Sequence, residues 1–503
     1  MKRIGIIELT PTSITLALNE VEDDGYFNKI DELTTSIRLF EDLIDGKCFS
    51  KEKISETLST LRAFKSMCEI SGVKKIIAVA TEAFKVTSNS DKLLNIIKDE
   101  LNIDITILDS YKEIYYNFLS ISNTIYFENS LIVDIEGTST HLAWVKNGEI
   151  QNYYSIPVGT LNLTLKYNLQ DIILREDLEA AKIMINKLID KCTWLKYADF
   201  DSIIGIGNTI KILGKIDRIK KRYPIDIQHN YVLYDIDVHD IYNLLKCKNL
   251  KQRSQIPGLP CDRADIMVAG VCIFLNLLNH TNVNKIITSA RGLKDGIMYE
   301  YIAKNYEYEK NMLIYSILGI MNKLNINKSH ANNVYKLCKD LFESLKPIHK
   351  LDDSFNRILI TSSLLHDCGT SIDYYNHHKH SFYIILNSSI NGLTQKELLM
   401  SAAIAAYHRN NKYSIPFPQY SSIINRNDIN AIEYIGTILK IAEGLDRSLE
   451  GAVSNINVYI DEESVKLELQ SSLDLEVEIS QAMRSACSFR EIYNRNLIIE
   501  KIN

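Results

Sequence analysis

Histidine and aspartate residues that could bind a metal ion lie in the last third of the chain. Seven of the eleven histidines fall between residues 330 and 408. His366 and Asp367 end an apolar, helix-like run, His330 starts an earlier helix, and Asp446 ends a later one. Imidazole and carboxylate ligands suit Mn, Fe, Zn, Co or Ni better than Ca, and such an ion activates a bound water for attack on phosphorus. On spacing alone, a helix C-terminal cap among solvated histidines explains the same residues.

A second group of histidines, at positions 377, 378 and 380, follows Tyr374, Tyr375 and Asn376. These polar neighbours predict a surface loop for two of the three, and His380 is the best candidate for a further ligand. The predicted metal ligands are His330, His366, Asp367, His380 and Asp446.

Carboxylates beside turns of small and hydroxyl residues lie in the N-terminal half. The apolar run from Leu131 to Ile135 carries Asp134 and leads into the turn 136–140, and Asn147-Gly148 then favours a tight hairpin. Because nothing bulky blocks such a turn, its N–H groups and hydroxyls can approach an anion closely. An ordinary pair of β-hairpins is the alternative.

The same plan occurs at the N-terminus. The run that begins at Arg3 ends at Glu8, residues 10–13 form a hydroxyl-rich turn, and Asp24-Gly25 gives the hairpin signal. This repeat of plan, rather than of letters, predicts two similar units that place two phosphate-sized turns across one cleft.

Two further segments fit phosphate chemistry. Residues 205–211 form a glycine turn between a strand and a helix, which suits an anion at the helix N-terminus. This turn lacks the dinucleotide-binding pattern, and a plain strand-to-helix turn explains it equally well. Glu113 opens a helix after a strand, where a carboxylate can act as general base on a water or simply as a first-turn helix charge.

The elements that position these residues change along the chain. Alternating strands and helices predict an α/β fold for residues 1–125 and again for 126–300. Amphipathic helices without strands predict an all-α domain over 301–450. Residues 451–503 predict a small α+β region, with one of its strands over Leu473 to Ile479.

The composition of the chain limits the class of protein and the cellular compartment that can be expected. The chain has 503 residues, a net charge of -6 and 46% apolar residues, which is typical of a globular protein and argues against binding to double-stranded nucleic acid. The nine cysteines form no C-x-x-C pair and indicate a reducing compartment. The longest uncharged stretch, Ile266 to Asn284, contains polar residues and predicts a buried helix rather than a membrane span. We therefore expect a cytoplasmic protein without a membrane anchor.

Several motifs together resemble the exopolyphosphatase and guanosine pentaphosphatase family. They are Pro257-Gly258-Leu259-Pro260 with Arg263-Ala264-Asp265, Gly292-Leu293-Lys294-Asp295-Gly296, and Gly205-x-Gly207-x-Thr209-Ile210-Lys211. The resemblance implies a duplicated actin-like, ribonuclease-H-like fold that cleaves terminal phosphates from polyphosphate or pppGpp with Mg²⁺ in the cleft between its lobes. It also implies that the third domain is HD-like, since His330, His366-Asp367 and Asp446 follow the metal-ligand order of HD phosphohydrolases.

The sequence departs from this family at the two turns. Glu8, Thr10 and Thr12 replace an aspartate, a glycine and an asparagine, and Pro11 removes an N–H donor. Further departures are Glu136, Gly137 and Thr138 for three glycines, His141 for a catalytic glutamate, and Lys85 and Asn162 for two arginines. These changes predict a partly degenerate front site.

Three hypotheses follow. The first is a phosphoanhydride hydrolase with Asp134 on the metal, Glu113 as base and His141 at the position of the family's glutamate. The second moves hydrolysis to the helical domain, so that the lobes only bind a phosphorylated ligand. The third is a regulatory protein without turnover. In each, polyphosphate or a phosphorylated guanine nucleotide is the expected partner, a homodimer is expected, and the helical domain could hold a transition metal. The predicted phosphate-binding residues are Glu8, Thr10, Thr12, Ser13, Lys85, Gly137, Thr138, Ser139, Thr140, Gly205, Gly207, Asn208, Thr209 and Lys211.

Overall fold

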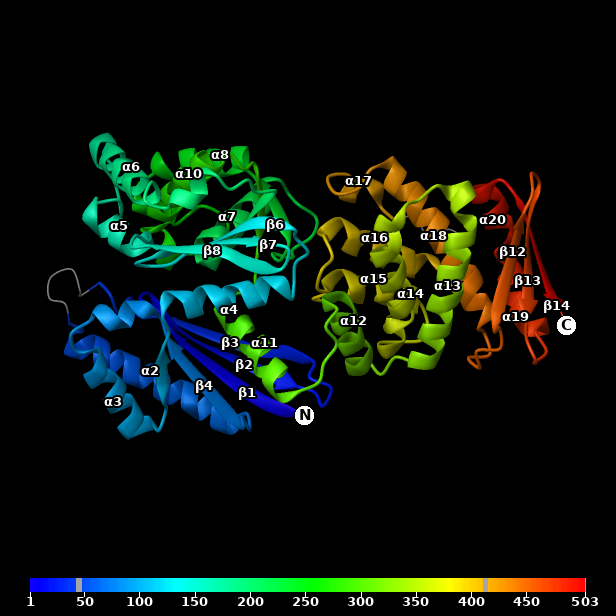
Figure 1. The fold of residues 1–503 in the computed structure, drawn as a ribbon, viewed down its shortest axis with the longest axis horizontal. Coiled ribbons are helices and arrows are strands. Elements are labelled where there is room, and N and C mark those ends of the chain that lie inside the picture. The colour runs from blue at the N-terminus through cyan, green and yellow to red at the C-terminus, as the bar shows by residue number, and fades with distance from the viewer. Residues whose placement is uncertain (42–47, 410–414, 503) are drawn as a thin grey trace. The chain divides into compact units, whose positions relative to one another are not determined.

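The structure is a computed structural model that describes residues 1–41, 48–409 and 415–502 (Figure 1). Contacts divide the chain into two compact units, Met1–Tyr308 and Glu309–Asn503. Each unit is described by itself.

The first sheet of the N-terminal unit has the strand order β3-β2-β1-β4-β5. Strand β1 pairs with β2 in antiparallel and with β4 in parallel orientation. The strands are β1 (Lys2–Leu9), β2 (Ser13–Val21), β3 (Phe27–Ser36), β4 (Lys75–Ala80) and β5 (Ile105–Ile107). The helices of this lobe are α2 (Lys51–Ile70), the 3-10 helix η1 (Glu82–Val86), α3 (Ser90–Leu101) and α4 (Ser110–Ser122).

The second sheet repeats this order as β8-β7-β6-β9-β11 and adds β10 at the β11 edge. Strand β6 again pairs with one antiparallel and one parallel neighbour, β7 and β9. The predicted duplication of plan, with two actin-like lobes, is therefore confirmed. The strands are β6 (Asn129–Ile135), β7 (Thr140–Lys146), β8 (Glu149–Ile156), β9 (Ser202–Ile206), β10 (Tyr231–Tyr234) and β11 (Lys285–Thr288).

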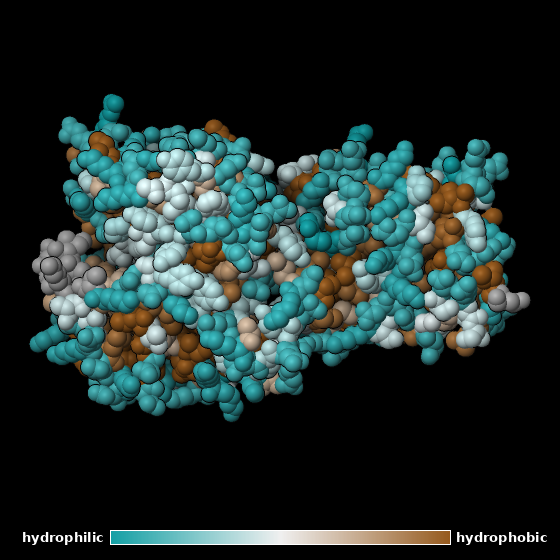
Figure 2. Space-filling model, viewed as in Figure 1, coloured by the Kyte–Doolittle hydropathy of each residue, from teal (hydrophilic) through white to brown (hydrophobic). Residues whose placement is uncertain are grey.

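Helices cover this second sheet. They are α5 (Thr160–Lys166), α6 (Arg175–Ile189), α7 (Gly207–Lys220), α8 (Asp235–Lys246), α9 (Leu250–Arg253) and α10 (Met267–Thr281). Helix α10 lies in the core, with all of its residues from Met267 to Leu278 buried. Among the described residues, no helix is long and apolar enough to cross a membrane. On the face drawn in Figure 2, hydrophilic residues predominate and apolar residues form smaller patches.

Helix α11 (Leu293–Asn305) returns to the first lobe. Its residues Leu293, Ile297 and Ile302 share a buried cluster with Ile4 and Ile6 of β1. The sequence analysis assigned residues up to 300 to the second lobe, whereas the apolar face of α11 packs on the first sheet. The chain therefore crosses between the lobes before and after the second sheet.

The C-terminal unit begins with helices alone, as predicted for an all-α region. These are α12 (Met312–Lys323), α13 (Lys328–His349), α14 (Asn356–Leu365), α15 (His377–Asn387), α16 (Gln395–Tyr407), α17 (Phe417–Tyr420) and α18 (Arg426–Leu445).

A small α+β region follows, with the sheet order β12-β13-β14. The strand predicted over Leu473 to Ile479 is wrong, because residues 476–483 form helix α19. Leu475, Glu478 and Ala482 are buried at helical spacing, and Ala482 lies against Gly444 of α18. The elements are β12 (Asn455–Ile460), β13 (Ser464–Gln470), α19 (Glu476–Met483), α20 (Ala486–Tyr493) and β14 (Asn496–Ile502).

Candidate functional site

A cleft between the two lobes of the N-terminal unit is lined by all three predicted turns. It contains about 980 Å³ of empty space, part of which is open to solvent. The first lobe contributes the residues after β1, and the second lobe contributes the ends of β6 and β9. The predicted residues that line it are Glu8, Thr10, Thr12, Ser13, Asp134, Gly137, Gly207, Asn208, Thr209 and Lys211.

The turns after β1 and β6 have the same local structure. In the first, the Thr10 N–H donates to the Ser13 carbonyl at 2.9 Å, and in the second the Glu136 N–H donates to the Ser139 carbonyl at the same distance. The side chains differ, but the closing backbone bond is the same. The two turns are therefore equivalent parts of the duplicated lobes.

Asp134, the next-to-last residue of β6, faces the start of α7. Its Oδ2 accepts a hydrogen bond from Asn117 Nδ2 at 2.7 Å. Its Oδ1 would lie 2.5 Å from a Cβ placed on Gly207, whose φ of +81° also favours glycine. Burial raises the pKa of Asp134, while the charge on His141 opposes that shift. The β9–α7 turn and the carboxylate thus fix each other's positions.

The buried side chains of Glu113 and His141 and the half-buried side chain of Glu136 form a group next to Asp134. Of the three, only Glu136 lines the cleft. His141 Nε2 on β7 lies 3.0 Å from Glu113 Oε2 on α4. Burial lowers the pKa of His141, but the Glu113 carboxylate outweighs burial and raises it above its usual value. Burial, followed by the charges of Glu113 and Asp134, holds the pKa of Glu136 well above its usual range.

Two cations in the cleft were absent from the predicted binding set. Lys294 Nζ lies 2.7 Å from Glu8 Oε2, and Arg263 donates to the Thr12 hydroxyl at 3.3 Å. Burial lowers the pKa of Lys294, but Glu8 and Glu32 outweigh it and raise that pKa. Both cations belong to the family-like motifs, so the motifs could have identified them. Glu8 therefore faces a lysine and is not free to face a phosphate.

Some predicted residues lie outside the cleft lining. Lys85 is exposed and pairs with Glu82 at 3.5 Å, because η1 turns its side chain toward that carboxylate. The Thr140 hydroxyl donates to the Val158 carbonyl at 2.7 Å. Gly205, Thr138 and Ser139 are also outside the lining.

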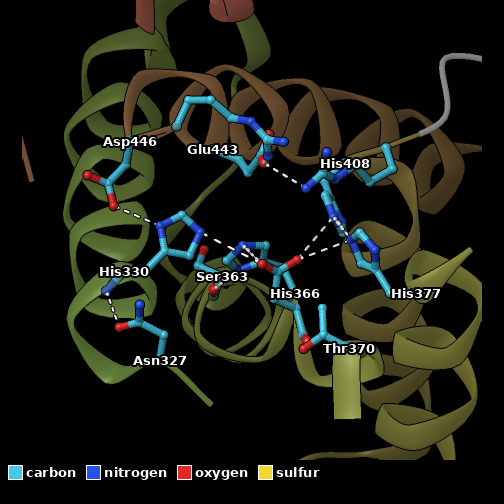
Figure 3. A network of polar contacts seen from close by, with 12 residues as sticks. Asn327, His330, Ser363, His366, Thr370, His377, His408, Glu443 and Asp446 are labelled. Carbon is cyan, nitrogen blue, oxygen red and sulfur yellow. Dashed lines mark hydrogen bonds and ion pairs between the residues drawn. The ribbon is translucent and has the colours of Figure 1, made fainter. Parts of the chain in front are cut away.

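In the C-terminal unit, His330, His366, His377 and His408 come together from four helices or their ends (Figure 3). Asp367 lies among these four histidines. Its Oδ2 is 3.8 Å from His330 Nε2 and 3.7 Å from His366 Nε2. Its Oδ1 is 3.2 Å from His377 Nε2 and 3.5 Å from His408 Nε2. These contacts form two groups with metal-ligand spacing that share Asp367. We call these five residues the histidine cluster.

Each imidazole of the histidine cluster is held by its other nitrogen. The Nδ1 atoms of His366 and His377 lie 2.7 Å from the Ser363 and Tyr374 carbonyls, and that of His408 contacts the Ala405 carbonyl. Hydrogen bonding at Nδ1 leaves Nε2 for a metal, as in most histidine-ligated metal sites. Burial lowers the pKa of His366 to about 4, which keeps its ring neutral.

Two predicted ligands lie outside these groups. Asp446 Oδ2 is 2.8 Å from His330 Nδ1, and its Oδ1 accepts from the Gly451 N–H, so Asp446 orients the His330 ring instead of facing Asp367. His380, the second of these predicted ligands, is not in either group, and His377 is the ligand candidate from this segment. The predicted surface loop is wrong for His377 and His378, which are buried in the first turn of α15. The sequence spacing did not predict His377 or His408 as metal ligands, because both side chains reach Asp367 only through the packing of separate helices.

A model of the Ppx/GppA phosphatase family matches residues 20–305, and one of Ppx/GppA phosphatase, domain III, matches residues 314–482. The chain is 22% identical over 461 residues to a guanosine-5'-triphosphate,3'-diphosphate pyrophosphatase of Aeromonas hydrophila, covering 89% of this chain and 88% of the relative. It is 22% identical over 485 residues to the protein of the same name in Aeromonas salmonicida, covering 91% and 93%.

Solved structures of similar proteins cover about three-fifths of this chain. A Ppx/GppA family member of Aquifex aeolicus is 25% identical with a TM-score of 0.53, and the match covers 60% of this chain and 98% of that one. An exopolyphosphatase from Cytophaga hutchinsonii is 23% identical with a TM-score of 0.56, covering 61% and 100%. The second likeness concerns the fold alone.

Proposed function

Because this chain belongs to the Ppx/GppA phosphatase family, we propose that it hydrolyses terminal phosphoanhydride bonds of pppGpp or inorganic polyphosphate in the cleft between its lobes. One observation carries this proposal: turns from both lobes and three basic side chains, Lys211, Arg263 and Lys294, line a single cleft. Backbone N–H groups in such turns and at the start of α7 bind phosphate oxygens. The basic side chains offset the negative charge of the substrate.

The proposed roles follow from position. Gly137 and the segment 207–209 would hold phosphates, and Lys294 would exchange its contact with Glu8 for a phosphate oxygen. Glu113, paired with His141, is the candidate general base for the attacking water. Asp134 fits the Mg²⁺ that the family resemblance implies, because Mg²⁺ often uses one carboxylate together with substrate phosphates and water. Bound there, Mg²⁺ would neutralise charge on the transferred phosphoryl group.

A second candidate function is supported by the histidine cluster. Four imidazole Nε2 atoms that converge on one half-buried carboxylate suit a transition metal, and a metal-bound water can attack a phosphate ester. Under this alternative the helical region, proposed as HD-like, is the hydrolase and the lobes only bind a phosphorylated ligand. A homodimer and a cytoplasmic location stay predictions of the sequence.

Phosphate release from pppGpp and from polyphosphate separates these functions. We expect Glu113→Gln to lower kcat by about 10²–10⁴-fold, while Asp367→Ala keeps the wild-type rate. Loss in Asp367→Ala alone would favour the helical region as the hydrolase. A folded wild-type chain that releases no phosphate from either substrate would contradict both and favour a regulatory protein without turnover.

A further inference from the structure

A polar pocket lies on the second lobe, among three of its helices. Helix α10 packs against α6 and α8, and Figure 1 draws the three helices together on this lobe. Residues of all three line the pocket, which contains about 780 Å³ of empty space, part of it open to solvent. These residues are different from those that line the cleft. We propose that the pocket binds a small phosphate compound that carries a hydroxyl group, either inorganic phosphate or the phosphate of a small polyol.

The charge of the pocket favours an anion. Lys182 of α6 and Lys246 of α8 line it, and its described lining residues include no carboxylate. Both lysines lie close enough to Glu179, just outside the lining, to lower the pKa of its carboxyl, Lys182 the more strongly. The pair of Lys182 with Glu179, at 2.8 Å, is exposed, and such pairs contribute little to stability, so an anion can compete for the lysine. In a chain with a net charge of -6, two neighbouring ammonium groups form a local site for phosphate.

Two buried polar atoms of the lining residues lack a partner. Tyr242 is only 5% exposed, and neither its hydroxyl nor Asn186 Oδ1 has a hydrogen-bond partner among the described residues. The Cys272 thiol lies beside the hydroxyl, but a thiol is only a weak hydrogen-bond group. Buried polar atoms are unfavourable when they are left unpaired. A ligand in the pocket would satisfy both atoms after small side-chain rotations.

These two atoms select among anions. The amide oxygen of Asn186 can only accept, so the ligand must donate an O–H to it, whereas the Tyr242 hydroxyl can donate to a phosphate oxygen. Inorganic phosphate keeps at least one O–H at neutral pH, and a polyol phosphate carries hydroxyl groups. Sulfate has the same shape but no O–H at this pH, so it leaves Asn186 unpaired. Phosphate is also the product of the proposed hydrolysis; a role in sensing that product rests on the proposed function, but the binding itself does not.

Isothermal titration calorimetry of the full-length chain with inorganic phosphate, glycerol phosphate and sulfate tests the proposal. Arg263→Gln is used as background and a chelator is present, so that the cleft and the histidine cluster contribute least. We expect Lys246→Gln to weaken phosphate binding at least about tenfold, because a charge-assisted hydrogen bond is lost. The matched control Lys248→Gln, two residues further along and outside the lining, should leave binding unchanged. Sulfate should bind at least about tenfold more weakly than phosphate. Glycerol phosphate that binds more tightly than inorganic phosphate would assign the site to a phosphorylated metabolite, and the reverse order to free phosphate.

Two further variants separate binding from stability. Tyr242→Phe removes an unpaired hydroxyl, so it should weaken phosphate binding without lowering the free energy of unfolding. Asn186→Leu should abolish the preference for phosphate over sulfate. Phosphate binding that is absent from the background chain, equal to that of sulfate, or unchanged by all three substitutions overturns the proposal. A chain that binds phosphate through Lys246 but releases none from pppGpp or polyphosphate supports this site and contradicts the proposed hydrolysis.

Discussion

The cleft of the N-terminal unit and the histidine cluster of the C-terminal unit position charged groups by different means. In the cleft, backbone turns at the ends of β1, β6 and β9 form the lining, and the first two are closed by the same N–H to carbonyl bond. In the histidine cluster, side chains at helix ends form the site, and each imidazole is held in place by an oxygen atom at its Nδ1. A site formed by backbone groups keeps its geometry when side chains are replaced, whereas a site formed by side chains loses a binding group with each replacement.

This difference explains how the second turn keeps its structure although Glu136 and Thr138 stand where the family has glycines. The closing bond needs only the backbone of Glu136 and Ser139. Changes that disturb the backbone should therefore harm the cleft most, and removal of single ligands should harm the cluster most.

The largest expected effect tests the backbone half of the comparison. Gly207→Ala places a methyl group 2.5 Å from Asp134 Oδ1, at a φ of +81°. We expect a loss of about 100-fold in phosphate release, because displacement of a reacting group by about 1 Å has that effect. The matched control is Gly148→Ala, which has a φ of +77° but no atom within 4 Å of the new Cβ. Equal loss of activity in both variants would show that strain, and not contact with Asp134, is responsible.

Removal of bound metal tests the prediction for the histidine cluster. A metal present at 100 times its Kd stabilises the folded state by about 2.7 kcal/mol. Chelator should lower the free energy of unfolding of the wild-type chain by about this amount, as measured by chemical denaturation. The part of this response that belongs to the cluster should vanish in Asp367→Ala. An identical chelator response in both proteins would mean that the cluster holds no ion.

A third prediction contrasts histidines inside and outside the cluster. His229 accepts the Ala290 N–H at Nδ1, at 3.3 Å, whereas the cluster rings face oxygens there. Burial, followed by the charge of Arg291, lowers the pKa of His229 to about 4. The unfolded chain, with a histidine pKa near 6.5, binds the proton more tightly, so stability is full above pH 6.5 and falls between pH 6.5 and 4.

Between pH 7 and pH 5 this histidine should cost about 2 kcal/mol of unfolding free energy. His229→Gln should show a correspondingly flatter acid limb in denaturation curves at these two pH values. A histidine resonance for His229 that titrates near pH 6.5 in the folded chain would contradict the assignment.

The smallest effect concerns the link between the lobes, which the cleft needs and the cluster does not. Arg38 of the first lobe holds Asp265 of the second through contacts of 2.6 and 2.8 Å. We expect Arg38→Gln to lower the free energy of unfolding by about 1–2 kcal/mol and to raise KM for phosphate release. The control Arg62→Gln removes an exposed pair with Glu100 and should cost less than about 1 kcal/mol. Equal costs would mean that the Arg38 pair is no stronger than a surface pair.

The sequence predicted much of the fold because the relevant signals were local. Both hairpins lie where Asp24-Gly25 and Asn147-Gly148 indicated, with Gly25 and Gly148 at positive φ. The turns after β1 and β6, and the end of helix α14 just before His366, were also predicted from neighbouring residues. Helix α19 was missed because the contact that buries its Ala482, against Gly444 of α18, comes from a distant part of the chain.

The sequence by itself determined which residues could bind phosphate or metal, since residue type fixes charge and ligand chemistry and a turn is set by a few adjacent residues. Tertiary structure alone decided which of them meet. Lys294 reaches Glu8 because α11 returns to the first sheet, His377 and His408 reach Asp367 through helix packing, and His141 reaches Glu113 because β7 lies beside α4. These pairs are up to 286 residues apart in the chain, so their proximity depends on how whole elements pack, which local spacing does not encode.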